Sequence, residues 1–470
     1  MAGPSNDKPL TSMDDLLAPF HDAEKPRGRW LVGTEAEKFG VHADTLAPIA
    51  FDGPRGVRAV LGELAARHGW TETPEVEGGE IISLLRGDAS ITLEPGGQLE
   101  LSGAPLGSMH STCAEFRGHM AELRDISEEL QILWLGVGFH PLARPDELPW
   151  VPKLRYAIMR EYLPTRGSMA TDMMRRTCTV QANFDYCGED DAVRKLRVSL
   201  ALSPIVQAMF ANSPFVEGRV TGERSHRARV WLHVDPDRSG ILPFAFTSGM
   251  TYRRYVEWAL DVPMFLVRRG AKVVRNTDQT FRQFMKDGRD GLTATHGDWE
   301  THLNTLFPEV RLKKTLEVRS ADAQQTALLC ALPSLWKGLL YEAGAFARAE
   351  LLASRLSPEA LEAARPDIAE RGPRATLAGR PVAEWAAEVL AIARAGLRTL
   401  SILSRDGNDE TVHLTRLGEL VECAQCPADL LLDGLDRDHP VTAADIVART
   451  RADATMHHPS TSAGSLRAPA

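Results

Sequence analysis

The chain has 470 residues and a formal net charge of −9, with 43% hydrophobic and 25% charged residues. These proportions are those of an ordinary globular protein, and they exclude a collagen, a coiled coil and a wholly disordered chain. The acidic balance argues against a protein whose main task is to grip nucleic acid, because phosphate groups attract basic surfaces.

The predicted elements mix strands and helices without a regular alternation of the two, which favours an α+β fold over a doubly wound sheet. Pro95, Gly96 and Gly97 have the chemistry of a tight turn, so the two strands that they join form a hairpin. In chain order we expect a helix at 12–18, a strand at 30–37, the hairpin strands at 91–94 and 98–102, a helix at 111–134, a strand at 177–186, helices at 191–212 and 252–260, a strand at 315–320 and a helix-rich segment from about 323 to 400.

The chain shows no internal repeat and no long linker, so we expect one elaborated domain. Residues 1–29 are predicted as a helical lead and residues 30–455 as the main domain with a helical C-terminal part. Residues 456–470 are rich in Ser, Ala, Gly and Pro and are predicted as a disordered tail.

The chain ends and the cysteines indicate an intracellular protein. No apolar run approaches the roughly 18 residues of a membrane span, and residues 1–10 lack the order of a signal peptide. We therefore expect a cytoplasmic location with no membrane partner. Six cysteines do not make a disulfide framework. We expect isolated structural thiols, including Cys113 and Cys330, and the C-x-x-C of Cys423 and Cys426 as structural, with a redox role as the alternative and metal binding least favoured.

Several predicted strands have one apolar face and one face of carboxylates and amides. Successive side chains of a strand point to opposite faces, so residues i and i+2 share a face. In the strand at 177–186, Val180 and Ala182 belong to the apolar face, whereas Gln181 and Asn183 belong to the polar face. Over all these strands, the polar faces include Glu35, Glu37, Glu94, Glu100, Gln181, Asn183, Glu317 and Arg319.

Two interpretations of these polar faces stay open. Each strand alone fits the solvated outer face of an antiparallel sheet. Together, however, they would gather five glutamates with no lysine among them, and two carboxylates 4 Å apart repel by about 4 kcal/mol at an effective dielectric of 20. A cation would relieve this repulsion. Oxygen ligands without Cys or His suit a hard divalent ion, Mg²⁺ or Mn²⁺.

Arginines are dense near these strands, and arginine binds carboxylates and phosphates through two parallel hydrogen bonds. The pair Arg175 and Arg176 leads directly into the polar-faced strand at 177–186. Carboxylates for a metal together with arginines indicate phosphoryl chemistry on a substrate that carries a carboxylate. The chain has no P-loop and no dinucleotide fingerprint, so ATP would be held by metals and a sheet.

The same segments resemble the glutamate–cysteine ligases of the plant and proteobacterial type. The matching stretches run in order over about residues 30–341, which is most of the chain. They are GTEAEKFGV (33–41), LEPGGQLELSGAP (93–105), PKLRYAIMREYLP (152–164), MMRRTCTVQANFDY (173–186), FANSPFVEG (210–218), ALDVPM (259–264) and FPEVRLKKTLEVRSAD (307–322).

The resemblance implies a glutamine-synthetase-like fold, in which a curved antiparallel sheet forms a funnel with helices outside. It also implies a reaction. ATP phosphorylates the γ-carboxylate of glutamate, and the amine of cysteine attacks this γ-glutamyl phosphate to give γ-glutamylcysteine, ADP and phosphate. The product would serve glutathione or ergothioneine synthesis, and the enzyme would be a monomer or homodimer.

The resemblance assigns roles to individual residues. Arg319 and Glu317 would be catalytic, with Arg319 neutralising the transferred phosphoryl group. Asn183, Gln181 and Arg319 would contact the nucleotide and its metal, and Arg160, Arg176 and Arg227 would bind substrate carboxylates. The Mg²⁺ ligands would be Glu35, Glu37, Glu94, Glu100 and Glu317. The alternatives are a carboxylate–amine ligase with a different amine acceptor and an inactive binding homologue.

Overall fold

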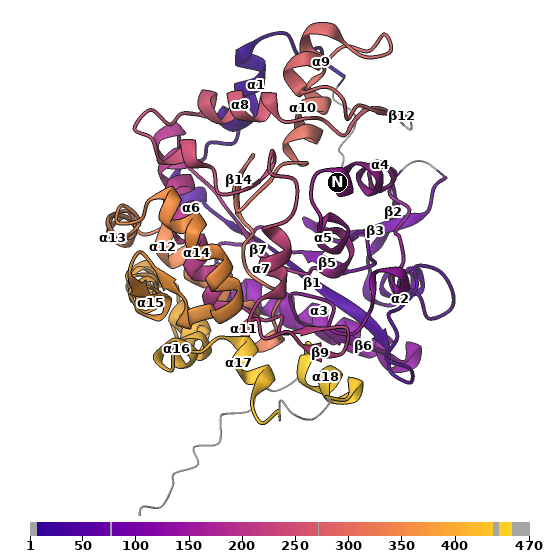
Figure 1. Cartoon of the computed structure of the whole chain (residues 1–470), viewed down its shortest axis with the longest axis vertical. Helices are drawn as coiled ribbons and strands as arrows, with labels where there is room; N and C mark the ends of the chain where they lie inside the picture. The colour runs from indigo at the N-terminus through magenta and orange to yellow at the C-terminus, as the bar shows by residue number, and fades with distance from the viewer. Residues whose placement is uncertain (1–6, 76–77, 271, 436–440, 454–470) are drawn as a thin grey trace, which may run out of the picture.

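A nine-stranded antiparallel sheet runs through the middle of the protein (Figure 1). The protein is described from a computed structural model, which covers residues 7–75, 78–270, 272–435 and 441–453. The strand order is β14-β15-β7-β1-β5-β4-β3-β2, and β6 pairs with β1 beside this path. The strands are β1 (Val32–His42), β2 (Thr71–Pro74), β3 (Ile81–Arg86), β4 (Ala89–Leu93), β5 (Leu99–Ser102), β6 (Ile132–Leu135), β7 (Val180–Phe184), β14 (Val310–Leu312) and β15 (Leu316–Val318).

The remaining strands form short two-stranded sheets outside the main sheet. They pair as β8 (Phe215–Val216) with β9 (Arg219–Val220), β10 (Ser239–Gly240) with β13 (Phe307–Pro308), β11 (Leu266–Arg269) with β12 (Lys272–Arg275), and β16 (Thr376–Leu377) with β17 (Arg380–Pro381). Short 3-10 turns are η1 (Arg27–Arg29), η2 (Pro145–Glu147), η3 (Leu163–Thr165), η4 (Pro243–Phe246), η5 (Gly372–Arg374) and η6 (Glu410–Leu414).

Helices surround the main sheet and confirm the predicted α+β class (Figure 1). Those before the C-terminal part are α1 (Met13–His21), α2 (Val57–His68), α3 (Met109–Leu130), α4 (Leu154–Tyr162), α5 (Ala170–Arg176), α6 (Glu189–Met209), α7 (His226–Trp231), α8 (Tyr252–Asp261), α9 (Phe281–Asp287) and α10 (His296–Leu303). The C-terminal part contains α11 (Thr326–Leu329), α12 (Ala331–Leu340), α13 (Ala343–Ala353), α14 (Pro358–Arg371), α15 (Val382–Leu400), α16 (Thr415–Glu422), α17 (Pro427–Leu432) and α18 (Ala443–Thr450).

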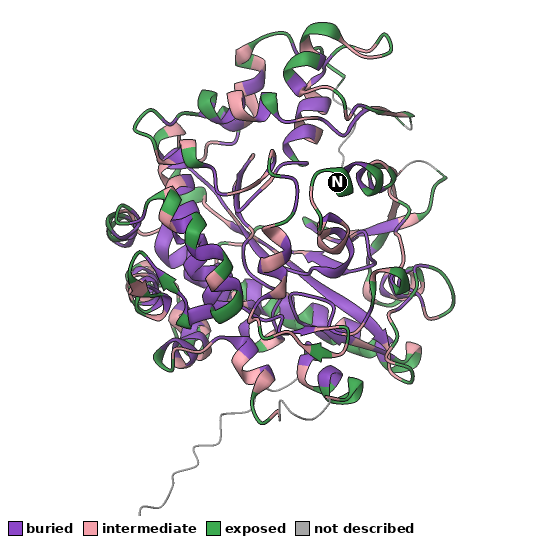
Figure 2. Cartoon of the chain, viewed as in Figure 1, coloured by how far each residue is buried: buried purple, intermediate pink, exposed green. Residues whose placement is uncertain are grey.

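The apolar face of the sheet is covered by α6 and α12, which contact the strands around β7 and β15. Helix α15 packs against α12 from the other side, so α12 is enclosed and all its residues are buried. Figure 2 shows this buried core extending from the sheet into the helices around α6 and α12. The first turn of α6 carries three acidic residues, which favour a helix start because they face its positive end. Helices α6 and α12 thus cover the apolar face of the sheet, and the candidate site residues lie on the opposite, polar face.

Most predicted elements near this sheet are confirmed, including the hairpin β4–β5 and strands β1, β7 and β15. The helix predicted at 111–134 is wrong at its end. Helix α3 stops at Leu130, because Gln131 adopts a left-handed φ of 51°, and the following residues form β6. The apolar residues of β6 pair with β1 instead of continuing the helix.

The expectation of isolated thiols is wrong for one pair of cysteines. Cys113 of α3 and Cys330, between α11 and α12, form a disulfide across 217 residues of sequence. Outside this disulfide, Cys178 and Cys426 are buried, and Cys187 and Cys423 are exposed.

The predicted N-terminal lead contributes α1, whose N-cap Ser12 forms a capping box with Asp15. Helix α1 packs against α8 and α10, at the top of Figure 1. The tail predicted as disordered, 456–470, lies outside the described residues. Within the described part of the chain, no helix combines the length and the apolar character that crossing a membrane requires.

Candidate active site

The strand register brings the predicted polar residues onto one face of the main sheet. Residues that lie directly opposite each other on neighbouring strands share a face. Glu37 lies opposite Glu100, and Glu35 lies opposite Gln181. On the next strand pair, Glu317 lies opposite Asn183. The sequence alternation therefore placed these side chains correctly, and pairing of strands far apart in the chain collects them.

Hydrogen bonds tie the amides of β7 to the carboxylates beside them. Asn183 Nδ2 donates to Glu35 Oε1 at 2.9 Å, and Asn183 Oδ1 accepts from Thr315 Oγ1 at 3.0 Å. Arg319 Nη1 donates to Gln181 Oε1 at 2.8 Å and to Glu317 Oε1 at 3.0 Å. The amides thus hold both a carboxylate and the arginine in place.

Glu94 joins this cluster from the turn that follows β4. Its backbone N–H bonds to the carbonyl of Gln98, which closes the β4–β5 hairpin. Its carboxylate accepts from Tyr156 Oη of α4 at 3.4 Å, and its negative charge acts on the nearby Glu37 and Glu100. Electrostatic interactions therefore connect four of the five predicted metal ligands: Glu100 acts on Glu35 and Glu37, and Glu94 acts on Glu37 and Glu100.

Burial and mutual repulsion make it costly for these carboxylates to ionise together. Burial, with the charges of Glu317 and Glu100, raises the pKa of Glu35 to about 7. Burial and the charge of Glu94 likewise raise the pKa of Glu37 and of Glu100. Buried groups of one sign that raise each other's pKa are typical of a site that awaits a cation or a proton.

Glu317 is in the opposite situation, since three cations surround its carboxylate. Burial acts to raise its pKa, but Arg311, Lys313 and Arg319 outweigh burial and hold the pKa well below its usual range. Arg311 Nε lies 2.6 Å from Glu317 Oε2, and Lys313 Nζ lies 3.4 Å from the same oxygen. A metal ion would have to share the carboxylate of Glu317 with these cations. Of the five predicted ligands, Glu317 is therefore the one whose oxygens are most engaged by other groups.

Arg311 and Lys313 were missed by the sequence analysis. Arg311 lies on β14 directly opposite Glu317, so it belongs to the polar face. The alternation of Val310, Arg311 and Leu312 is the available signal, but a strand of three residues is too short to read reliably.

The three arginines predicted to bind substrate lie in different surroundings. Arg227 of α7 is buried, and its two Nη groups donate to the carbonyls of Arg319 and Ser320 at 2.9 Å each. It therefore supports the backbone behind Arg319, and its charge also reaches Glu37. Its Nε is buried without a hydrogen-bond partner in the described residues.

Arg176 and Arg160 make other contacts than Arg227 does. Arg176 is buried, with Nη1 on Asp172 at 3.1 Å and its guanidinium 4.5 Å from the ring centre of Phe139. Arg160 of α4 is exposed, with its guanidinium 4.8 Å from the ring centre of Trp150. The charge of Arg227 therefore reaches Glu37 on the polar face of the sheet. The described contact of Arg160 is with Trp150 and does not bring Arg160 to these glutamates.

Comparison with known proteins identifies the family of the chain. The family model of glutamate–cysteine ligase family 2 (GCS2) matches residues 31–458. The chain is 42% identical to a chloroplastic glutamate–cysteine ligase of Brassica juncea, over 91% of this chain and 81% of that protein. It is also 42% identical to glutamate–cysteine ligase B, chloroplastic, of Oryza sativa subsp. japonica, with 91% and 84% coverage.

These relatives contradict the expected cytoplasmic location, because they are named as chloroplastic proteins. Among solved structures, a glutamate–cysteine ligase of Francisella tularensis in complex with AMP superposes with a TM-score of 0.53. It is 13% identical and covers 90% of this chain and 87% of that one, so it supports a shared fold. On the extent of the family match and the identity to its curated members, the chain belongs to glutamate–cysteine ligase family 2.

Proposed function

We propose that this protein is an ATP-dependent glutamate–cysteine ligase. It transfers the terminal phosphoryl group of ATP to the γ-carboxylate of glutamate, and the amine of cysteine then displaces phosphate to form γ-glutamylcysteine. The observation that carries the proposal is the group of carboxylates that the strand register places on one sheet face, with Arg319 beside it. The family to which the chain belongs supports the same reaction.

The donor set fits Mg²⁺ or Mn²⁺. The ligands would be Glu35, Glu37, Glu94 and Glu100, with Glu317 shared between the metal and its cations. Carboxylate oxygens suit hard divalent ions, and a bound cation would counter the burial and mutual repulsion that raise the pKa of Glu35, Glu37 and Glu100. When bound, the metal would neutralise the phosphates of ATP.

The chain's own groups then have distinct tasks. A carboxylate is a poor electrophile, and phosphorylation gives its carbonyl carbon a leaving group. Arg319 would stabilise the charge on the phosphoryl group in transfer, held in place by Gln181 and Glu317. Asn183 and Gln181 would lie against the nucleotide and its metal.

Arginines would orient the carboxylates of the substrates. Arg176 and Arg227 are the better candidates, because each has a buried Nε without a hydrogen-bond partner in the described residues. A bound carboxylate would satisfy these donors, whose burial without a partner is otherwise costly. Arg160 stays a weaker candidate, since it is exposed.

We also propose that the sheet is the curved funnel of a glutamine-synthetase-like catalytic domain. Its antiparallel pairing throughout and its covering of helices on one face support this assignment.

An assay of ADP release with glutamate and MgATP tests the proposal. Cysteine should be the best amine acceptor, and mass spectrometry should identify γ-glutamylcysteine. With ¹⁸O in the γ-carboxylate of glutamate, one labelled oxygen should appear in the released phosphate. No ADP release with cysteine would overturn the proposal, and faster release with another amine would favour the alternative ligase.

The variant Glu35→Gln separates this reaction from simple binding. It removes a proposed metal ligand while keeping the side-chain shape, so turnover should be lost and the circular dichroism spectrum retained. Glu72→Gln is the matched control, because Glu72 lies exposed on β2 of the same sheet. Full activity of Glu35→Gln would show that the metal assignment is wrong.

A further inference from the structure

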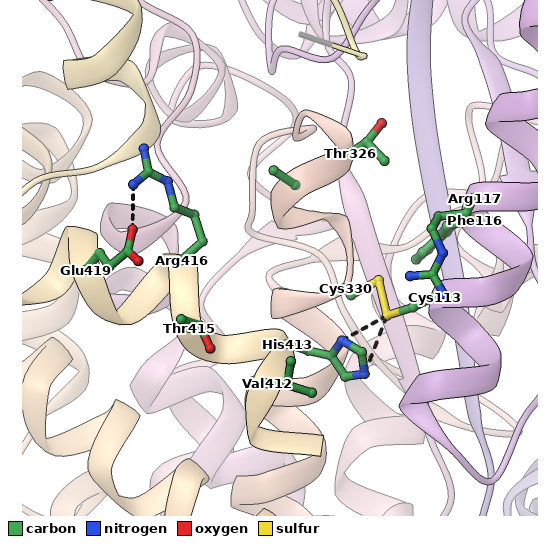
Figure 3. A pocket seen from close by; sticks show the side chains of 11 residues that line it. Cys113, Phe116, Arg117, Thr326, Cys330, Val412, His413, Thr415, Arg416 and Glu419 are labelled. Atoms are coloured by element: carbon green, nitrogen blue, oxygen red, sulfur yellow. Dashed lines mark hydrogen bonds and ion pairs between the residues drawn. A yellow bond between two sulfur atoms is a disulfide. The ribbon is translucent and has the colours of Figure 1, made fainter. Parts of the chain in front are cut away.

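Three segments that are far apart in the sequence meet at the Cys113–Cys330 disulfide. Cys113 lies on α3, Cys330 lies at the start of α12, and His413 lies on η6. The two sulfur atoms and a ring nitrogen of His413 all lie within 4.8 Å of one another. Figure 3 shows the ring of His413 turned toward the sulfur of Cys113, with Nδ1 3.4 Å from Sγ.

The contact between His413 and His110 fixes which nitrogen of His413 carries the proton. His413 Nε2 lies 3.0 Å from His110 Nδ1, and His110 Nε2 lies 3.4 Å from the carbonyl oxygen of Ile402. A carbonyl only accepts, so His110 Nε2 carries the proton and His110 Nδ1 accepts from His413 Nε2. The Nδ1 of neutral His413 then keeps an unprotonated lone pair, and Nδ1 is the ring nitrogen nearer to Cys113 Sγ, at 3.4 Å against 3.8 Å for Nε2.

The ring is kept in this neutral form. Burial lowers the pKa of His413 to about 4, and the neighbouring charges of Arg117 and Lys337 act in the same direction. A disulfide sulfur has no proton to donate, so the closed disulfide offers the lone pair of Nδ1 no hydrogen bond. Neutral imidazole is the form of histidine that binds metals.

The cluster is accessible from one side. A cavity of about 350 Å³ borders both cysteines and His413, and its other walls include Arg117, Thr326 and Glu419 (Figure 3). Cys113 is buried, whereas Cys330 is partly exposed. A dithiol can therefore reach Cys330 Sγ, and a fourth ligand has room beside the three protein atoms.

We propose that reduction of the Cys113–Cys330 disulfide opens a site for a soft divalent metal ion of the Zn²⁺ class, bound by Cys113 Sγ, Cys330 Sγ and His413 Nδ1. Two thiolates and one imidazole, with the fourth position open to water, form a recognised zinc ligand set. His110 orients His413 from behind, as groups in contact with a ligating histidine commonly do.

The steps balance with a dithiol as reductant. A thiolate of the dithiol attacks Cys330 Sγ, the S–S bond breaks, and Cys113 leaves as a thiolate. The second thiol of the reductant displaces Cys330, so the protein gains two electrons and the reductant becomes a disulfide. Binding of M²⁺ then displaces the two thiol protons to solvent. Metal and disulfide exclude each other, because both use the same sulfur atoms.

Titration of the full chain with Co²⁺ tests this site. Protein reduced with a phosphine, freed of the reductant and kept anaerobic should bind Co²⁺ with thiolate-to-cobalt charge-transfer absorption, and Zn²⁺ should displace it. The oxidised protein should lack this absorption. Carboxylates give no such band, so Co²⁺ in the glutamate cluster does not interfere, and failure here would leave the proposed ligase function intact.

Variants identify the ligands. Cys113→Ser and Cys330→Ser should each abolish the charge-transfer band, and His110→Ala should weaken Co²⁺ binding by about 10–100-fold. The control Cys423→Ser removes an exposed thiol outside the cluster and should leave the band unchanged. Equal absorption in reduced and oxidised wild-type protein would overturn the proposal without any variant. A band that survives in folded Cys113→Ser would also overturn it.

Discussion

Arg319 reaches the polar face of the sheet through its bonds to Gln181 and Glu317, so its guanidinium is held where phosphoryl charge is proposed to develop. We predict that Arg319→Gln lowers kcat by roughly 10²–10³-fold and changes the KM for glutamate little, because the lost charge acts mainly in the transition state. Steady-state kinetics check this, with Arg405→Gln at an exposed position as control. A kcat close to that of the wild type would refute the role of Arg319.

The same residues show what alternation along a strand predicts and what it misses. Glu35, Glu37 and Asn183 could be placed on a polar face because apolar neighbours alternate with them. Arg311 could not, since its strand is short and a single arginine there fits a solvated face equally well. Which oxygen receives which donor depends on tertiary packing, which no local pattern encodes.

At the scale of elements, the hairpin β4–β5 was predictable because its turn is local. Gly97 has a φ of 82°, which only glycine adopts without strain, as the predicted turn requires. The reason for Gly96 is not local. A Cβ there would lie 2.4 Å from the backbone oxygen of Arg175, so α5 packs directly on the turn. The disulfide was missed for the same reason, because its cysteines meet only after α3 and α12 have packed.

Helix α12 is tied to η6 and α3 by a buried ion pair. Lys337 Nζ lies 2.7 Å from Glu410 Oε2, and Glu410 Oε1 also accepts from the backbone N–H of Met109. We predict that Lys337→Met lowers the free energy of unfolding by about 3–5 kcal/mol, because it leaves a buried carboxylate uncompensated. Urea unfolding of the purified variant measures this change.

The double variant Lys337→Met/Glu410→Leu should recover part of the loss, since it removes both charges together. The exposed pair Arg355 and Glu388, 3.2 Å apart, serves as control, and Arg355→Met should cost less than about 1 kcal/mol. A double variant that is less stable than Lys337→Met would show that the pair is not the cause.

For the whole molecule, the net charge of −9 does not indicate where uncompensated carboxylates are concentrated. Many carboxylates form ion pairs with arginines on the surface, as Glu388 does with Arg355. Glu35, Glu37 and Glu100 of the polar face are instead gathered on neighbouring strands, and their pKa values are raised. The α+β class followed from the order of the predicted elements, whereas the strand order, with β1 between β7 and β5, depends on contacts between distant segments.

This concentration of charge predicts a stability that depends on pH and on metal. The pKa of Glu35 is about 7 in the folded metal-free protein against an ordinary value of 4.5, so the folded state binds more protons between these values. The protonated carboxyl group of Glu35 therefore contributes fully to stability below pH 4.5, and this contribution is lost as the pH rises through 7. The loss lowers the free energy of unfolding by at most about 3 kcal/mol. The raised pKa values of Glu37 and Glu100 act in the same direction.

Mg²⁺ should reverse this loss, because it binds the ionised carboxylates of the folded state. At a Mg²⁺ concentration 100 times the dissociation constant, binding should add about 3 kcal/mol to the free energy of unfolding. Urea unfolding at several pH values between 5 and 8, with EDTA or with Mg²⁺, measures both effects. In Glu35→Gln the fall with pH should be shallower and the gain from Mg²⁺ smaller, whereas the control Glu72→Gln should behave as wild type. If wild-type stability at pH 8 is the same with EDTA and with Mg²⁺, these carboxylates do not form a metal site.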